Sequence, residues 1–162
     1  RPDVSTQMIM PQNVIVSLQQ NWEKIYFLAE AGWANWSKMQ DTILNVRGYS
    51  AVTPLNWKDT YRLGVGGKYK FTQKFLMQAG VSYDSSPTST ALRQPDLPMD
   101  RQIRAGIGIM YDLIKQATLA VSYEYLSLGR ASINNTTSSG TLSGYYPTNY
   151  ANTFQISINI AI

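Results

Sequence analysis

Five basic residues fall at even positions of two stretches in which apolar residues hold the odd positions: Lys58, Arg62, Lys68, Lys70 and Arg104. Side chains in a β-strand alternate between two faces, so the sequence predicts that these cations share one face. An ammonium or guanidinium group on such a surface binds a carboxylate through charge-assisted hydrogen bonds. The spacing therefore suggests a site for a hydrophobic molecule with one anionic end. Charge balance across the surface is the alternative role for the same residues.

Lys58 is our first candidate for a contact with the headgroup of such a ligand. It should face the polar side near one end of its strand, and no acid is expected opposite it. Arg62 and Arg104 are the second candidates. The alternative for Lys58 is that its side chain simply reaches solvent at the end of the strand.

The chain of 162 residues has no histidine and no cysteine. Their absence excludes Ser-His-Asp and Cys-His nucleophile systems, thiolate metal sites and most zinc sites. We therefore expect no catalytic residue, no metal site and no cofactor. The net charge of +4 is small and no basic run accompanies it, so a nucleic-acid partner is not expected either.

The clearest structural pattern is the alternation that runs from about Tyr61 to Tyr83. Apolar residues occupy the odd positions up to Phe71, and after Thr72, Gln73 and Lys74 they occupy the odd positions again from Phe75. Period-two alternation on both sides of a short turn predicts a β-hairpin. One face of this hairpin is apolar and aromatic, and the other is polar, charged and rich in glycine.

The same pattern predicts seven strands, over residues 13–20, 24–46, 57–71, 74–84, 101–111, 116–126 and 150–162. Residues 24–46 also fit helical spacing, and we choose a strand because everything after them is β. Short turns near residues 22, 73 and 114 alternate with long loops at 47–56, 85–100 and 129–149. Residues 1–12, with Pro2 and Pro11, look like a connector.

Short turns at one end and long loops at the other are typical of outer-membrane barrels. Only 15% of the residues are charged, below the roughly 25% of ordinary soluble domains. The predicted fold class is therefore all-β: a segment of an antiparallel, up-and-down transmembrane β-barrel with about seven strands. A soluble sheet with tyrosines on its core face is the alternative that the pattern leaves open.

Three stretches resemble the FadL/TodX family of outer-membrane transporters: LAEAGWANWSKM (28–39), NWKDTYRLGVGGKYKF with the following AGVSYDSSP (56–87), and LPMDRQIRAGIG (97–108). The resemblance implies a fourteen-stranded barrel plugged by an N-terminal hatch, of which residues 13–162 would be the C-terminal part. The N-terminal half of the same barrel would then be a partner of this segment. The chain begins Arg-Pro-Asp, so we expect a fragment or a processed chain.

The resemblance also implies a function, which is passive uptake of long-chain fatty acids or other hydrophobic compounds. The expected location is the outer membrane of a Gram-negative bacterium, with membrane lipid around the barrel and the hydrophobic ligand inside. A soluble lipid-binding barrel or sandwich without a transport role is the rival hypothesis. An outer-membrane hydrolase ranks third, because the chain has no histidine to serve as a base.

Turn geometry gives the sharpest structural expectation. A three-residue loop at 72–74 places Arg62 opposite Asp84, Tyr69 opposite Met77 and Gly66 opposite Gly80. A three-residue loop at 113–115 places Ile107 opposite Val121 and Arg104 opposite Glu124. Alternation further predicts that Arg104, Gln155 and Asn159 face inward, and that six apolar residues face outward: Ile103, Ile107, Ile109, Val121, Ile156 and Ile158.

Overall fold

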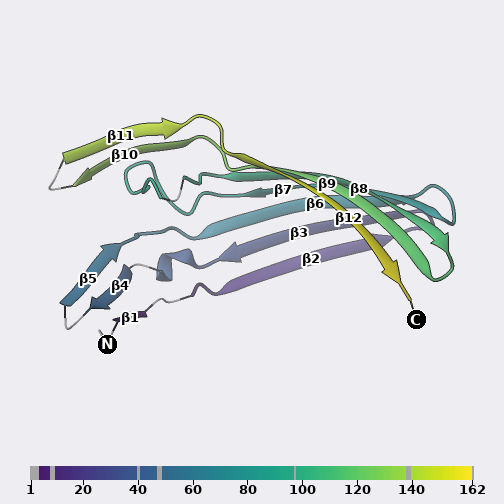
Figure 1. Ribbon diagram of the computed structural model, residues 1–162, viewed down its shortest axis with the longest axis horizontal. Helices are drawn as coiled ribbons and strands as arrows, with labels where there is room; N and C mark the ends of the chain where they lie inside the picture. The colour runs from purple at the N-terminus through teal and green to yellow at the C-terminus, as the bar shows by residue number, and fades with distance from the viewer. Residues whose placement is uncertain are drawn as a thin grey trace.

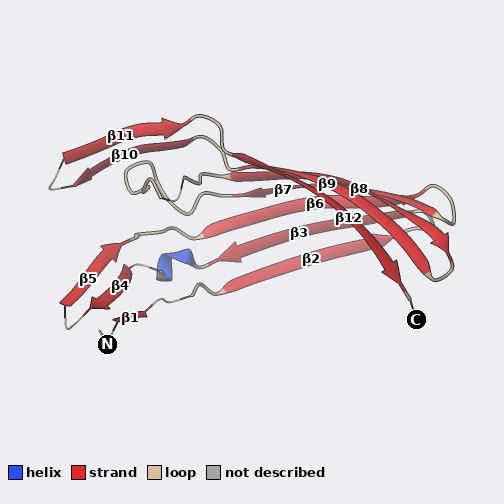
Figure 2. Cartoon of the chain, in the orientation of Figure 1, coloured by secondary structure: helices blue, strands red, loops and turns tan. Residues whose placement is uncertain are grey.

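The computed structural model describes residues 4–7, 10–39, 41–46, 49–96, 98–137 and 140–161. This part of the chain contains twelve strands and one short 3-10 helix, η1 (Trp36–Lys38). The helix is drawn in blue and the strands in red in Figure 2. No helix in these ranges is long and apolar enough to cross a membrane. The all-β class predicted from the sequence is confirmed.

Seven of the strands form one antiparallel sheet, which we call the wall, in the order β12-β9-β8-β7-β6-β3-β2. From one edge to the other they are β12 (Tyr150–Ile160), β9 (Ala117–Ser127), β8 (Gln102–Ile114), β7 (Phe75–Asp84), β6 (Thr60–Lys70), β3 (Ile25–Ala34) and β2 (Asn13–Asn21). Neighbours along the wall follow one another along the chain apart from two excursions. The wall is thus the up-and-down segment that the sequence predicts.

The connections are short at one end of the wall and long at the other (Figure 1). Residues 22–24, 71–74 and 115–116 make the short turns, whereas residues 35–59, 85–101 and 128–149 make the long connections. We call these the turn end and the loop end. The predicted asymmetry is confirmed, although the long connections contain more structure than expected.

Two small sheets extend the loop end (Figure 1). One has the order β1-β4-β5, with β1 (Val4–Gln7), β4 (Asp41–Val46) and β5 (Tyr49–Pro54). The other is the hairpin of β10 (Ala131–Thr137) and β11 (Gly140–Tyr146). The predicted loops at 47–56 and 129–149 are therefore wrong in part, and β1 lies inside the predicted connector.

The predicted strand over residues 24–46 is confirmed only in part, because β3 ends at Ala34 and a second strand, β4, begins at Asp41. The backbone N–H of Ser37 donates to Asp59 Oδ1 at 3.0 Å, and the Trp33 indole donates to Asp59 Oδ2 at 3.1 Å. The Ser37 hydroxyl also lies 2.8 Å from Asn35 Oδ1. These contacts hold the segment around η1 against Asp59. The chain therefore leaves the wall after Ala34 instead of continuing along it.

Arg93 organises the long connection between β7 and β8, and only 3% of it is exposed. Its guanidinium donates to the Met99 carbonyl at 2.9 Å and pairs with Asp100 Oδ1 at 3.0 Å. It also donates to the Ser132 carbonyl of β10. One buried cation therefore holds the 85–101 connection against the β10–β11 hairpin.

The β6–β7 hairpin has the predicted register, with Arg62 opposite Asp84, Tyr69 opposite Met77 and Gly66 opposite Gly80. The Thr72 hydroxyl accepts hydrogen bonds from the N–H groups of Lys74 and Phe75, at 3.2 and 3.0 Å. This bonding fixes the turn length on which the register depends.

The predicted register of the β8–β9 hairpin is wrong by two residues. Ile109 lies opposite Val121, and Arg104 lies opposite Leu126, while Glu124 lies opposite Gly106. The strands continue to Ile114 and Ala117, so the turn is shorter than expected, and the register shifts between Asp112 and Ile114. Leu113 is the extra residue of β8, and it forms a β-bulge there. A shift of two leaves every side chain on its predicted face.

Candidate ligand-binding face

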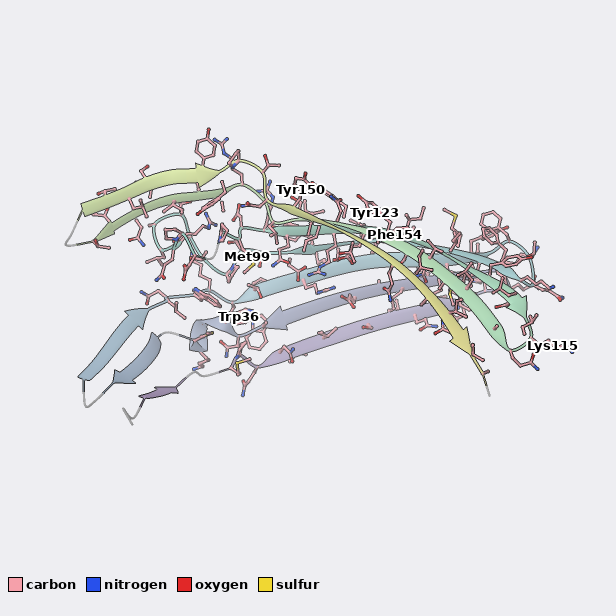
Figure 3. All side chains as sticks on the ribbon, in the orientation of Figure 1. Trp36, Met99, Lys115, Tyr123, Tyr150 and Phe154 are labelled. Carbon is pink, nitrogen blue, oxygen red and sulfur yellow. The ribbon has the colours of Figure 1, made fainter. Side chains whose placement is uncertain are left out.

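One face of the wall is apolar and open. Large apolar side chains stand on it in every wall strand, including Leu18, Leu63, Val81, Ile107, Tyr123 and Ile156. Leu63 is 62% exposed and Ile156 is 61% exposed. We call this the outer face. In Figure 3, Tyr123 and Phe154 stand on neighbouring strands of the wall, β9 and β12.

The opposite face lines a cavity of about 610 Å³, to which all seven wall strands contribute. Polar residues among its lining come from both edges of the wall, from Gln19 on β2 to Gln155 on β12. Arg62, Lys68 and Arg104 also line it. We call this the cavity face. Because the β8 register is continuous from Ile103 to Asp112, Arg104 and Ile107 lie on opposite faces, as predicted.

Five charged residues form a band across the cavity face, one on each of five neighbouring strands: Glu30, Arg62, Asp84, Arg104 and Glu124. Their signs alternate along the wall, from β3 to β9. Arg62 Nε lies 2.6 Å from Glu30 Oε1, and Arg62 Nη1 lies 3.7 Å from Asp84 Oδ1. Arg104 Nη1 lies 3.4 Å from Glu124 Oε1. We call this band the charged belt.

The two arginines of the belt make different numbers of ion pairs. Arg62 pairs with acids on both neighbouring strands. Arg104 pairs with one acid, and its buried Nε has no hydrogen-bond partner among the described residues. Glu124 is offset from Arg104 by two positions, and long side chains reach such a diagonal neighbour. The belt has three carboxylates and two guanidinium groups, so its formal charge is −1.

The structure separates the three residues predicted to bind a headgroup. Arg62 and Arg104 line the cavity but are held in ion pairs. Lys58 lies in the loop before β6, where its backbone N–H donates to the Pro87 carbonyl at 2.7 Å. Its side chain is exposed at the loop end and is not part of the cavity lining.

Glu30 is a belt residue that the sequence analysis did not single out. Its signal was present in the alternation of Ile25, Phe27, Ala29 and Ala31, which puts Glu30 on the opposite face from them. The partner could not be found without the pairing of β3 with β6, strands that are separated by a long connection.

Comparison with known proteins places these features in context. The profile of a family described as "Outer membrane protein transport protein (OMPP1/FadL/TodX)" matches residues 4–160. An outer membrane protein of Neisseria meningitidis serogroup B, NMB0088, is 29% identical over 92 residues. A "Long-chain fatty acid transport protein" of Escherichia coli O6:H1 is 25% identical over 109 residues.

A solved structure matches nearly the whole chain. The crystal structure of a Pseudomonas aeruginosa FadL homologue superposes on 97% of this chain with a TM-score of 0.87 and 25% identity. The matched region is 37% of that protein. For the Neisseria and Escherichia relatives the sequence matches cover 56% and 65% of this chain but only 20% and 23% of those proteins. The chain therefore spans well under half the length of its relatives.

Proposed function

Because the chain belongs to the outer membrane protein transport protein family (OMPP1/FadL/TodX), we propose that it forms the C-terminal part of a passive uptake channel. The cargo is a long-chain fatty acid or another hydrophobic compound, and the membrane is the outer membrane of a Gram-negative bacterium. The observation that carries the proposal is the opposition of an apolar outer face and a polar cavity face on the same strands. The N-terminal half of the barrel completes the lumen, and the protein acts as a channel and not as an enzyme.

In this arrangement the outer face contacts lipid, and the turn end points to the periplasm. Aromatic contacts near both ends of the wall support it. At the turn end the rings of Tyr69 and Phe71 are 4.6 Å apart, and at the loop end those of Tyr125 and Tyr150 are 6.0 Å apart. Tyrosine and tryptophan prefer the boundary between lipid and water, where such rings form a girdle.

The ligand arrives from the loop end, binds inside and leaves by diffusion. Lys58 is the first contact for a carboxylate headgroup, because its exposed ammonium stands at the loop end and makes no ion pair with any described residue. Arg62 and Arg104 come second, since a carboxylate has to compete with the acids of the belt. Of these two, Arg104 has more hydrogen-bonding capacity to spare.

The proposal is tested on the complete barrel in lipid nanodiscs, with oleate as the ligand. Lys58→Ala should weaken oleate binding by several-fold to about tenfold, the loss expected for one partly exposed charge-assisted contact. Lys115→Ala, at the far end of the wall, should leave binding unchanged (Figure 3). Unchanged binding with Lys58→Ala removes Lys58 from the site.

A separate measurement addresses the membrane itself. The outer face should make the barrel dependent on detergent or lipid, so that it aggregates in plain buffer. A protein that is monodisperse in plain buffer without refolding would contradict the channel and favour a soluble lipid-binding barrel.

A further inference from the structure

Four glycines lie together on the cavity face: Gly64 and Gly66 on β6, Gly80 on β7 and Gly106 on β8. Gly66 lies opposite Gly80, and Gly80 lies opposite Gly106, so three neighbouring strands carry no side chain at one level. We call this group the glycine shelf. The shelf is flat backbone at Gly66, Gly80 and Gly106, whereas a Cβ at Gly64 would lie 3.1 Å from Cγ of Glu30. Glycine in a strand often marks a close approach by another group.

Packing within the wall explains some of these glycines but not all. A Cβ at Gly66 would lie 3.2 Å from the Ala79 carbonyl oxygen, and one at Gly80 would lie 3.2 Å from that of Val65. At Gly106 the nearest atom would be 3.6 Å away, which is an ordinary contact. Gly106 does not have a positive φ either. Among the described residues, neither the backbone nor the neighbours of Gly106 require glycine, and Gly106 lines the cavity.

Lys68 borders the shelf on the turn side, two residues after Gly66 on the same face of β6. Every ion pair among the described residues is made by an arginine, and Lys68 takes part in none. The residues opposite Lys68 are neutral, Tyr26 on β3 and Gln78 on β7. Lys68 is therefore an uncompensated cation in the cavity lining, in contrast to the two belt arginines.

We infer that Lys68 and the glycine shelf form a binding subsite for a small anionic amphiphile, with the anionic group on Lys68 and the apolar part on the shelf. The subsite is separate from Lys58, and it rests on the proposed channel function while naming one class of cargo. The charged belt borders the shelf through Arg104 on the loop side of Gly106, through Glu30 opposite Gly64, and through Glu124 opposite Gly106. Because the belt has an excess of carboxylates, it repels an anionic group and orients the ligand toward Lys68.

The size of the shelf limits the apolar part of this ligand. Three strands span about 10 Å at the usual strand spacing, and two successive inward residues span about 7 Å. Such an area accommodates a ring or a short alkyl chain, and a longer chain would extend over the belt. The favoured ligand therefore has one carboxylate and a compact apolar body.

The proposed contact between Lys68 and the anionic group is tested with octanoate and 1-octanol, which differ in the charge of the headgroup. With the complete barrel in nanodiscs, Lys68→Gln should weaken octanoate binding about tenfold and change 1-octanol binding by less than about twofold. Lys115→Gln, which removes a lysine outside the cavity, should change neither. An equal loss for both ligands, or no loss for octanoate, would overturn the assignment of Lys68.

The shelf is tested by filling it. Gly106→Leu should weaken octanoate and 1-octanol alike, by about tenfold, because its side chain occupies the space of the apolar part. Gly144→Leu in β11 is the matched control, because it makes the same substitution outside the cavity. A Cβ at Gly144 would meet no atom within 4 Å. If Gly106→Leu does not fold, Gly106→Ala should give a smaller loss of the same kind. Unchanged binding of both ligands in a folded Gly106 variant would show that the glycine shelf does not bind the apolar part of the ligand.

These outcomes separate the subsite from the channel function. A wild-type barrel that binds oleate but not octanoate contradicts the subsite alone. A wild-type barrel that binds neither oleate nor octanoate contradicts the proposed function and, with it, the subsite.

Discussion

The wall and the loop end bury their side chains in opposite ways. Among the described residues of the seven wall strands, Gly108 alone is buried. At the loop end several side chains are buried, including Asn35, Met39, Arg93 and Ile133. The wall is a single layer between two environments and has no core of its own. Apart from Gly108, every buried residue among those whose exposure is described lies at the loop end, in the connections after β3 and β7 and in β10.

This difference indicates what stabilises each part. The wall depends on its ladder of backbone hydrogen bonds and on the match between each face and the medium around it. The loop end depends on side-chain packing and on the hydrogen bonds of Arg93. Substitutions should therefore follow one set of rules on the wall and another at the loop end.

The largest effect should come from a charge on the outer face of the wall. Ile156 lies near the middle of β12, so Ile156→Arg should destabilise the folded barrel by about 2–4 kcal/mol if this level is the bilayer midplane. Gln155→Arg, one residue away on the cavity face, is the control and should cost much less. Equilibrium unfolding in lipid vesicles measures both, and equal losses would mean that the two faces do not differ in environment.

The next largest effect should come from the buried cation at the loop end. Arg93→Gln should lower stability by about 2–3 kcal/mol, because it removes an ionic hydrogen-bond donor from several acceptors. Arg101 pairs with the same acid, Asp100, at 3.8 Å but is 56% exposed. Arg101→Gln should thus cost less than about 1 kcal/mol. The free energy of unfolding of the two variants decides the matter; similar values would show that burial of Arg93 contributes nothing.

Smaller effects are expected from the belt. Double-mutant cycles should give about 0.2–1 kcal/mol for the Arg62–Asp84 and Arg104–Glu124 pairs, because both are partly exposed. Arg62→Gln should cost more than Arg104→Gln, since Arg62 has two acidic neighbours. The reverse order would contradict the unequal pairing seen across the wall.

The smallest effect concerns pH at the junction of the two regions. Hydrogen bonds from the side chain and backbone of Ser37, and from the Trp33 indole, lower the pKa of Asp59 below its usual value of 3.8. Because the pKa is lower in the folded state, the stabilisation is complete above the unfolded pKa and is lost as the pH falls through the folded pKa. Tryptophan fluorescence should therefore change in a step below pH about 4. Asp59→Asn should abolish that step, and a step that persists in this variant would assign it to another group.

Prediction from sequence also succeeded unevenly in the two regions. The wall strands were found because each alternates between an apolar and a polar face, and the β6–β7 register was found because its turn has the expected length. The β8–β9 register was missed because the bulge at Leu113 leaves no mark in the sequence, where Leu113 and Ile114 are both apolar. The sign pattern of the belt was only half visible, since Glu30 meets Arg62 across a long connection.

The loop end was largely hidden from sequence analysis. The β10–β11 hairpin consists mainly of Ser, Thr, Asn and Gly, which give no clear period-two pattern. Arg93 stands in a loop between prolines, and nothing in its neighbours indicates that it is buried against Ser132, 39 residues away. Such contacts depend on which long connections meet, and that is decided by the order of strands in the wall.

Cysteine labelling tests the central claim, that one face of the wall lines an aqueous lumen and the other lies in lipid. These 162 residues contain no cysteine, so each single substitution introduces the only thiol of this segment. Adjacent pairs on three strands are suitable: Gln78 and Ala79, Ser122 and Val121, Gln155 and Ile156. In the complete barrel in lipid, a membrane-impermeant thiol reagent should modify Cys at 78, 122 and 155 and spare Cys at 79, 121 and 156. Equal modification within the pairs, or the reverse pattern, would contradict the account.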